Sequence, residues 1–102
     1  MDEIQKELKG FLDADGRVKS FPAKWRKKIV VFYYLASKFE PKKEYTEKEV
    51  NALLNDWTLW GDPATVRRGM FDFHLLNRTA DGKFYWKEET PPALEDALKK
   101  FG

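Results

Sequence analysis

The chain of 102 residues contains no cysteine and a single histidine, His74. Without cysteine there is no disulfide framework, no thiolate zinc site and no cysteine nucleophile. One imidazole would leave a metal site dependent on carboxylates, an uncommon ligand set for zinc or copper. The six glycines are scattered, which excludes a glycine-rich phosphate loop, and neither Ser20 nor Ser37 has the glycine neighbours of a nucleophile elbow. We therefore predict that the protein is not an enzyme and holds no cofactor or metal.

Long hydrophobic runs are also missing. The longest apolar stretch without charge, residues 29–37, is far shorter than the roughly 18 residues that a membrane span requires. The charged first residues do not resemble a secretory signal. We predict one cytoplasmic domain over residues 1–102, with no membrane partner, a core at about residues 8–87 and a C-terminal tail at 88–102 that carries a short helix.

The net charge of +2 hides an uneven distribution of charge. Residues 16–43 contain nine basic residues and one acidic residue, a balance of +8, whereas the rest of the chain carries −6. This segregation predicts a surface that faces a polyanion. The ordinary alternative is a lysine-rich helix face that only keeps the protein soluble.

Hydrophobic periodicity predicts five helices. The first includes Ile4, Leu8, Phe11 and Leu12, and the others cover about residues 24–39, 46–57, 62–73 and 93–101. A capping box formed by Thr46 and Glu49 marks the start of the third helix. Asp62 and Pro63 mark the start of the fourth, because Asp is a favoured N-cap and Pro a favoured first helical residue.

Alternation of polar and apolar residues predicts a short strand at residues 17–21 and a hairpin at residues 75–79 and 83–87. Asp81 and Gly82 between the last two segments are a strong hairpin signal. Phe84 and Trp86 share one face of their strand and Tyr85 takes the other, and we expect these aromatic side chains to close the core. The order of elements predicts an α+β, mostly α fold: a winged helix-turn-helix with a C-terminal two-stranded wing and short flanking helices.

An ordered series of residues extends through most of the chain. It consists of Asp15-Gly16-Arg17, Pro22, Tyr45-Thr46-Glu47, Glu49-Val50-Asn51, Leu54, Asp62, Arg67-Arg68, Leu75-Leu76, Arg78, Asp81-Gly82 and Tyr85. This series resembles the domain-of-unknown-function family 2087 over about residues 8–87. The resemblance implies a winged-helix-type module of small bacterial proteins and of predicted transcriptional regulators, and it assigns no catalytic or binding residue.

Two positions depart from that family pattern. Gly69 stands where the family usually has a longer, often charged residue, and His74 stands where it usually has glycine. Histidine is among the residues that tolerate a left-handed backbone, so we predict a structural role for His74 at the end of the fourth helix.

Three groups of residues are candidates for DNA binding. The first turns of the fourth helix are the part that helix-turn-helix proteins place in the major groove, and arginine there pairs with guanine or phosphate. Four cations at the start of the second helix oppose its dipole and add salt-sensitive phosphate contacts. The tip of the hairpin carries a further lysine. The candidate residues are Thr65, Arg67, Arg68, Lys24, Arg26, Lys27, Lys28 and Lys83.

Each arginine of the fourth helix also has a structural alternative. Arg68 and Asp72 are spaced i, i+4 and suit an exposed ion pair, and Arg67 suits an ion pair with Asp62 or Glu47. The third helix region, residues 44–61, carries a charge of −3, which disfavours DNA. From the sequence, DNA contact and structural pairing are equally supported for this pair of arginines.

The sixteen aromatic residues support a second function. Trp and Tyr are favoured anchors at protein interfaces. Exposure of Trp60, Phe71 and Tyr34 as one patch would favour a partner protein or a self-dimer. We therefore predict a DNA-binding domain in transcription regulation, with double-stranded DNA as its partner; the alternative is a protein-interaction or ligand-responsive module of the same fold that does not bind DNA.

Overall fold

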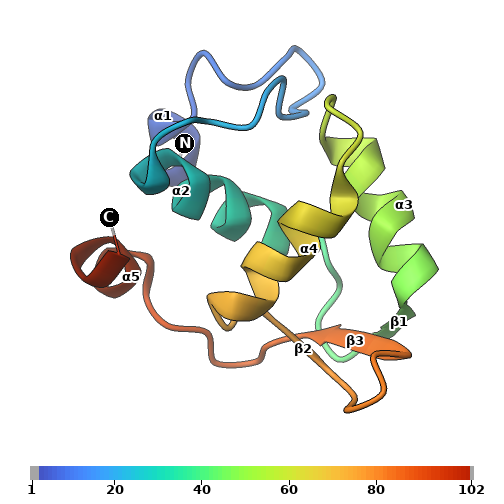
Figure 1. Cartoon of the computed structure of the whole chain (residues 1–102). Coiled ribbons are helices and arrows are strands. Elements are labelled where there is room, and N and C mark those ends of the chain that lie inside the picture. Colours follow the sequence, from blue (N-terminus) through green and yellow to red (C-terminus); the bar gives the residue numbers. More distant parts are fainter. Residues whose placement is uncertain (1–2, 102) are drawn as a thin grey trace.

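The computed structural model describes residues 3–101 of the chain. This part contains five helices and three strands, with about half of the residues in helices, which confirms the predicted α+β class (Figure 1). The elements are α1 (Glu3–Glu7), α2 (Trp25–Ala36), β1 (Glu44–Thr46), α3 (Glu47–Trp57), α4 (Pro63–Asp72), β2 (Leu76–Arg78), β3 (Phe84–Lys87) and α5 (Leu94–Phe101). Residues 1, 2 and 102 of the predicted domain lie outside the described residues.

Helix α2 forms the centre of the core. Its side chains Ile29, Val30, Val31 and Leu35 are fully buried, and they point to more than one side of the helix. Helices α1, α4 and α5 all contact α2, so this helix is surrounded as its broad apolar face predicts (Figure 1). It ends at Ala36, because residues 37–39 form a tighter turn whose N–H groups bond to carbonyls three residues back.

The N-terminal region differs from the prediction. Helix α1 ends at Glu7 instead of continuing to residue 12, and no strand forms at residues 17–21. The carboxylate of Asp13 accepts hydrogen bonds from the backbone N–H groups of Asp15 and Arg17, both at 2.9 Å, and this closes a turn. Beyond the turn, Val18 makes only isolated bridges, antiparallel to Leu12 and parallel to Thr58. A local turn therefore replaces the regular helix and strand expected here.

Helices α3 and α4 begin as predicted. The hydroxyl of Thr46 accepts the backbone N–H of Glu49 at 3.1 Å, and the Glu49 carboxylate accepts the N–H of Thr46 at 2.8 Å. These hydrogen bonds hold the pKa of Glu49 below its ordinary value. The carboxylate of Asp62 accepts the N–H of Thr65 at 3.3 Å, with Pro63 in the first turn. The capping residues predicted from the sequence therefore accept hydrogen bonds from backbone N–H groups in the first turns of both helices.

The C-terminal half of α4 is fitted closely to α2. An added Cβ on Gly69 would lie 2.3 Å from Cζ of Phe32, so Gly69 faces α2. After the helix ends, His74 adopts a left-handed backbone with φ of 60°, which confirms its predicted structural role.

The predicted two-stranded wing has a third strand, β1, which the sequence did not indicate. The β2–β3 hairpin is present, and β1 pairs with the other edge of β3, giving an antiparallel sheet of order β1-β3-β2 with Tyr45 opposite Tyr85. Only Tyr85 of the three hairpin aromatics is buried; Phe84 is 41% exposed and Trp86 is partly exposed. The expectation that all three close the core is wrong, because the core covers only one face of β3.

Helix α5 contacts α2; its Ala97 is buried, and its Leu94 and Leu98 pack against the core. The hydroxyl of Tyr33 donates to the carbonyl of Pro92 at 2.8 Å and ties the preceding segment to α2 as well. Within residues 3–101, none of the helices combines the length and the apolar character required to cross a membrane.

Candidate functional site

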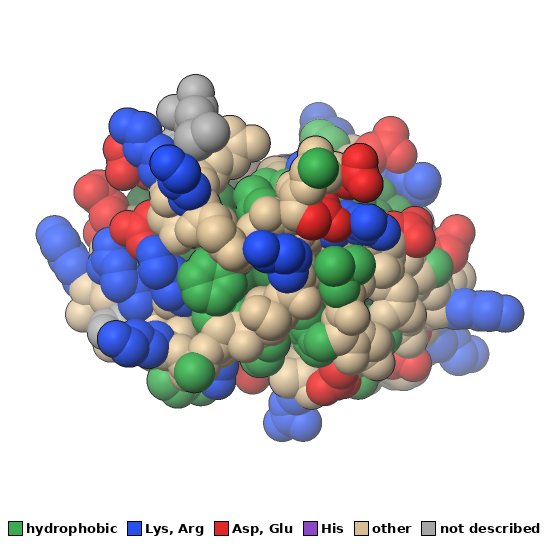
Figure 2. All heavy atoms as spheres, turned by 90° about the horizontal axis from the view of Figure 1, so that it is seen from above, with side chains coloured by type: hydrophobic (Ala, Val, Ile, Leu, Met, Phe, Trp, Pro, Cys, Tyr) green, Lys and Arg blue, Asp and Glu red, His purple; other side chains and the backbone are tan. Residues whose placement is uncertain are grey.

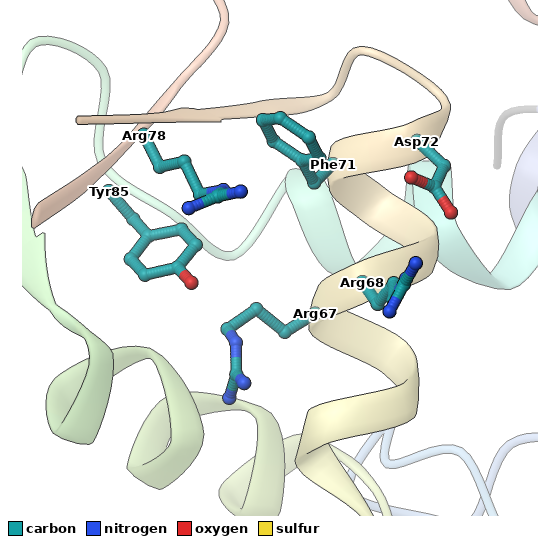
Figure 3. A pocket seen from close by; sticks show the side chains of 6 residues that line it. All are labelled: Arg67, Arg68, Phe71, Asp72, Arg78 and Tyr85. Carbon is teal, nitrogen blue, oxygen red and sulfur yellow. The ribbon is translucent and has the colours of Figure 1, made fainter. Parts of the chain in front are cut away.

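A pocket of about 250 Å³ lies between α4 and the β2–β3 hairpin (Figure 3). We call it the arginine pocket, since three of its six lining residues are arginines. The lining residues are Arg67, Arg68, Phe71, Asp72, Arg78 and Tyr85. Three guanidinium groups against one carboxylate favour an anion in this pocket.

Arg67 is held by the protein itself. Its side chain is only 17% exposed and points toward α3, where it donates a hydrogen bond to Asn51 and forms an ion pair with Glu47 at 3.5 Å (Figure 3). Its guanidinium carbon lies 5.8 Å from the centre of the Tyr85 ring. Of the two acidic partners that the sequence offered, Glu47 forms the pair and Asp62 does not. Arg67 therefore links α4 to α3 and to the sheet.

Arg68 is in the opposite situation. It is exposed, and it forms no hydrogen bond or ion pair with any part of the chain that the structure describes, residues 3–101. The expected i, i+4 ion pair with Asp72 is not formed, although both side chains lie on the same side of α4 (Figure 3). The positive charge of Arg68 is thus available to a partner.

The hairpin supplies the third arginine. The guanidinium carbon of Arg78 lies 4.8 Å from the centre of the Phe71 ring, a cation–π contact that holds it at the pocket. The hairpin tip is fixed by Asp81, whose carboxylate accepts the hydroxyl of Thr79 at 2.6 Å and the backbone N–H of Lys83 at 3.0 Å. The bond from Thr79 holds the pKa of Asp81 below its ordinary value. Lys83 is exposed at this tip but does not line the pocket.

The four cations at the start of α2 do not act as one cluster. Lys27 donates to the carboxylate and to the carbonyl of Glu7, both at 2.6 Å, and Arg26 donates to the same carboxylate at 3.0 Å. The bond from Lys27 is the main reason that the pKa of Glu7 lies below its ordinary value. These two cations hold α1 against α2. Lys24, the N-cap residue, is exposed.

Lys28 lies over aromatic rings instead. Its ammonium is 4.7 Å from the centre of the Trp25 ring and 5.2 Å from that of Phe21. It lines a second hollow, of about 360 Å³, between the start of α2 and α4, which we call the aromatic groove. The lining residues are Phe21, Trp25, Lys28, Phe32, Thr65, Arg68, Gly69 and Asp72. The hydroxyl of Thr65 donates to Asp62 at 2.7 Å.

The two hollows are adjacent and share Arg68 and Asp72. A line of cations, Lys28, Arg68 and Arg78, therefore crosses α4 from one hollow to the other. On the face seen in Figure 2, basic side chains gather around exposed hydrophobic ones toward the side where α1, α2 and α5 lie in Figure 1. The sequence places Arg78 near the hairpin turn, where it could contact a DNA backbone, but its position beside Phe71 of α4 depends on how the hairpin packs.

The aromatic patch expected from the sequence is not formed. Tyr34 is buried, at 5% exposure, and Trp60 is partly covered by stacking on Phe21 at 5.4 Å between ring centres. Among residues 3–101, the exposed large aromatics are instead Trp25 at 55%, Phe101 at 53% and Phe84 at 41%. Within residues 3–101, no three histidine, aspartate or glutamate residues are grouped so that they could hold a metal ion.

These features define a small α+β protein with a cationic line across α4 and two adjacent hollows. The family described as "Uncharacterized protein conserved in bacteria (DUF2087)" matches residues 17–87. The chain belongs to this family, and the matched region contains every residue that lines the arginine pocket and the aromatic groove. No curated protein and no solved structure matches the chain.

Proposed function

We propose that this chain is a winged helix-turn-helix domain that binds double-stranded DNA and acts in transcription regulation. The order of elements supports the proposal: α3 and α4 are joined by the short segment 58–62, and the β2–β3 hairpin follows α4 directly. In this arrangement α4 is the helix that enters the major groove and the hairpin lies beside it against the DNA backbone.

The observation that carries the proposal is the line of cations across α4. Arg68 presents a guanidinium without a partner in the described chain, and Arg78 and Lys28 lie on either side of it. Arginine on a helix in the major groove pairs with guanine or with phosphate, and flanking cations neutralise phosphates. Lys24 and Lys83 are exposed as well.

The acidic residues of α3 disfavour DNA binding less than the charge of −3 on residues 44–61 suggests. Glu47 is paired with Arg67, and Glu49 accepts the backbone N–H of Thr46 in the capping box. Both carboxylates are therefore engaged by groups of the protein. The negative charge near α4 is partly neutralised before DNA approaches.

The test is binding to random-sequence duplex DNA across a series of salt concentrations. Three phosphate contacts, by Lys28, Arg68 and Arg78, give a slope of log K against log salt of about −3. Arg68→Ala is expected to reduce that slope by about 1 and to change the free energy of unfolding by less than about 0.5 kcal/mol. Absence of binding at about 50 mM salt would overturn the proposal.

Arg26→Ala is the matched control for the DNA experiment. Its guanidinium is paired with Glu7, so its removal is expected to leave the salt slope unchanged. An equal decrease in slope for Arg26→Ala and Arg68→Ala would mean that general charge, and not the line across α4, determines binding.

A second candidate function is interaction with another protein. Trp25 and Phe101, each more than half exposed, contact Phe73 from two sides, with ring centres 6.2 and 5.0 Å away. Exposed aromatics around a common centre are typical of interface anchors. Concentration-dependent association in sedimentation, abolished by Phe101→Ala and accompanied by no DNA binding, would favour this function.

A further inference from the structure

We infer that the aromatic groove binds a small aromatic monocarboxylate. This site adjoins the arginine pocket and shares Arg68 and Asp72 with it, but its occupation by a small ligand does not require DNA binding. The groove has about 360 Å³ of space, within the range of about 300–1,000 Å³ typical of small-ligand sites.

The walls and floor suit a flat ring. Phe21, Trp25 and Phe32 line the groove, and Trp25 is 55% exposed, so a large part of this residue is accessible to the ring of a ligand. Gly69 provides a floor without a side chain. A Cβ at that position would meet Phe32 at 2.3 Å, so the Phe32 ring lies directly on Gly69 and the two together close the bottom of the groove.

The charges at the rim suit a single negative charge. Lys28 lies over Trp25 and Phe21 on one side, and Arg68 stands on α4 at the other. Asp72 is the only carboxylate among the eight lining residues, so the rim has a balance of +1. An aromatic acid places its ring on Trp25 and its carboxylate between the two cations, where charge-assisted hydrogen bonds are strong.

The experiment follows the side-chain indole N–H resonances of ¹⁵N-labelled protein during titration with phenylacetate. The four tryptophans give four such resonances, and the spectrum of Trp25→Phe identifies that of Trp25. We expect a saturable shift of the Trp25 resonance with a Kd of about 1 mM or below. Phenylacetamide, which lacks the charge, and cyclohexylacetate, which lacks the aromatic ring, are each expected to bind at least about fivefold more weakly.

A pair of lysine variants locates the carboxylate. Lys28→Gln is expected to weaken phenylacetate binding about tenfold. Lys38→Gln is the matched control, because the Lys38 ammonium also lies over two aromatic rings, 4.6 Å from Tyr34 and 4.2 Å from Trp57, but does not line the groove. We expect unchanged affinity for this variant.

Several results would overturn the inference. They are the absence of a saturable Trp25 shift at about 20 mM phenylacetate, equal affinity for phenylacetamide, and equal weakening by the two lysine variants. A Trp25 shift on simple dilution of the free protein would instead identify the groove as a contact between two copies of the chain. The comparison of the three ligands uses the unaltered protein, so instability of a variant does not affect it.

Discussion

Replacement of Gly69 by alanine tests the close approach of α4 to α2. In an exposed helix, Gly→Ala stabilises by about 1 kcal/mol, because alanine restricts the unfolded backbone and glycine does not. Here the new methyl carbon would lie 2.3 Å from Cζ of Phe32 and 2.8 Å from Cε1 and Cε2 of the same ring. Normal carbon contacts are about 3.5–4.0 Å, so the two helices must separate by about 1 Å or the ring must move.

The ring has little room to move. Phe32 is only 2% exposed, and its ring lies 5.9 Å from Phe21 and 5.7 Å from Phe73, centre to centre. Overpacking of this kind costs about 1–3 kcal/mol, and contact at three ring atoms places the cost near the upper limit. After subtraction of the propensity gain, we expect Gly69→Ala to lower the free energy of unfolding by about 2 kcal/mol, a decrease in Tm of about 8–16 °C.

Thermal unfolding followed by circular dichroism measures this change, and a double-mutant cycle identifies its cause. In a Phe32→Leu background the methyl group meets a smaller side chain, so Gly69→Ala should cost at least about 1 kcal/mol less than in the unaltered protein. An increase in Tm on Gly69→Ala alone would refute the close packing of α4 on α2, and with it the floor of the aromatic groove.

Three further predictions concern contacts described above. Thr46→Ala removes the capping box of α3 and should lower the free energy of unfolding in urea by about 1 kcal/mol. Arg67→Ala, which deprives two side chains of α3 of their partner, should lower it by about 1.5–3 kcal/mol, whereas Arg68→Ala should change it by less than about 0.5 kcal/mol. Because Lys27 holds the pKa of Glu7 below its ordinary value of 4.5, the stability from this carboxylate is complete above that pH and is lost as pH falls through the lowered pKa. Tm measured below about pH 5 should therefore decrease less steeply for Glu7→Gln than for the unaltered protein; identical slopes would contradict the role of this ion pair.

Local signals in the sequence predicted the elements whose determinants are local. The capping residues Thr46 and Asp62, the turn at Asp81 and the left-handed residue His74 each depend on neighbours within a few positions, and each was found as expected. Strand β1 was missed because its three residues pair with β3, about 40 positions further along the chain. No pattern within three residues indicates such a partner.

The candidate site also depends on contacts between distant residues, which the sequence does not reveal. The charge balance of residues 16–43 is an example. By its sequence this stretch is strongly basic. In the structure, however, Lys27 and Arg26 form ion pairs with Glu7, and Arg17 forms one with Asp13. Both of these acidic residues precede the stretch in the sequence. Part of the apparent positive surface is therefore internal pairing. The sequence therefore does not indicate which cations are available to a partner. Arg68, which lies outside this stretch, is available because of the way the helices pack.

The position of Arg68 between two hollows has a thermodynamic consequence. One guanidinium group cannot direct its hydrogen bonds into the arginine pocket and the aromatic groove at the same time. If DNA and an aromatic acid both bind through Arg68, each must therefore lower the affinity for the other, and by the same factor, because coupling between two binding equilibria is reciprocal. A single side chain would then make DNA binding by this domain responsive to the concentration of a small aromatic acid.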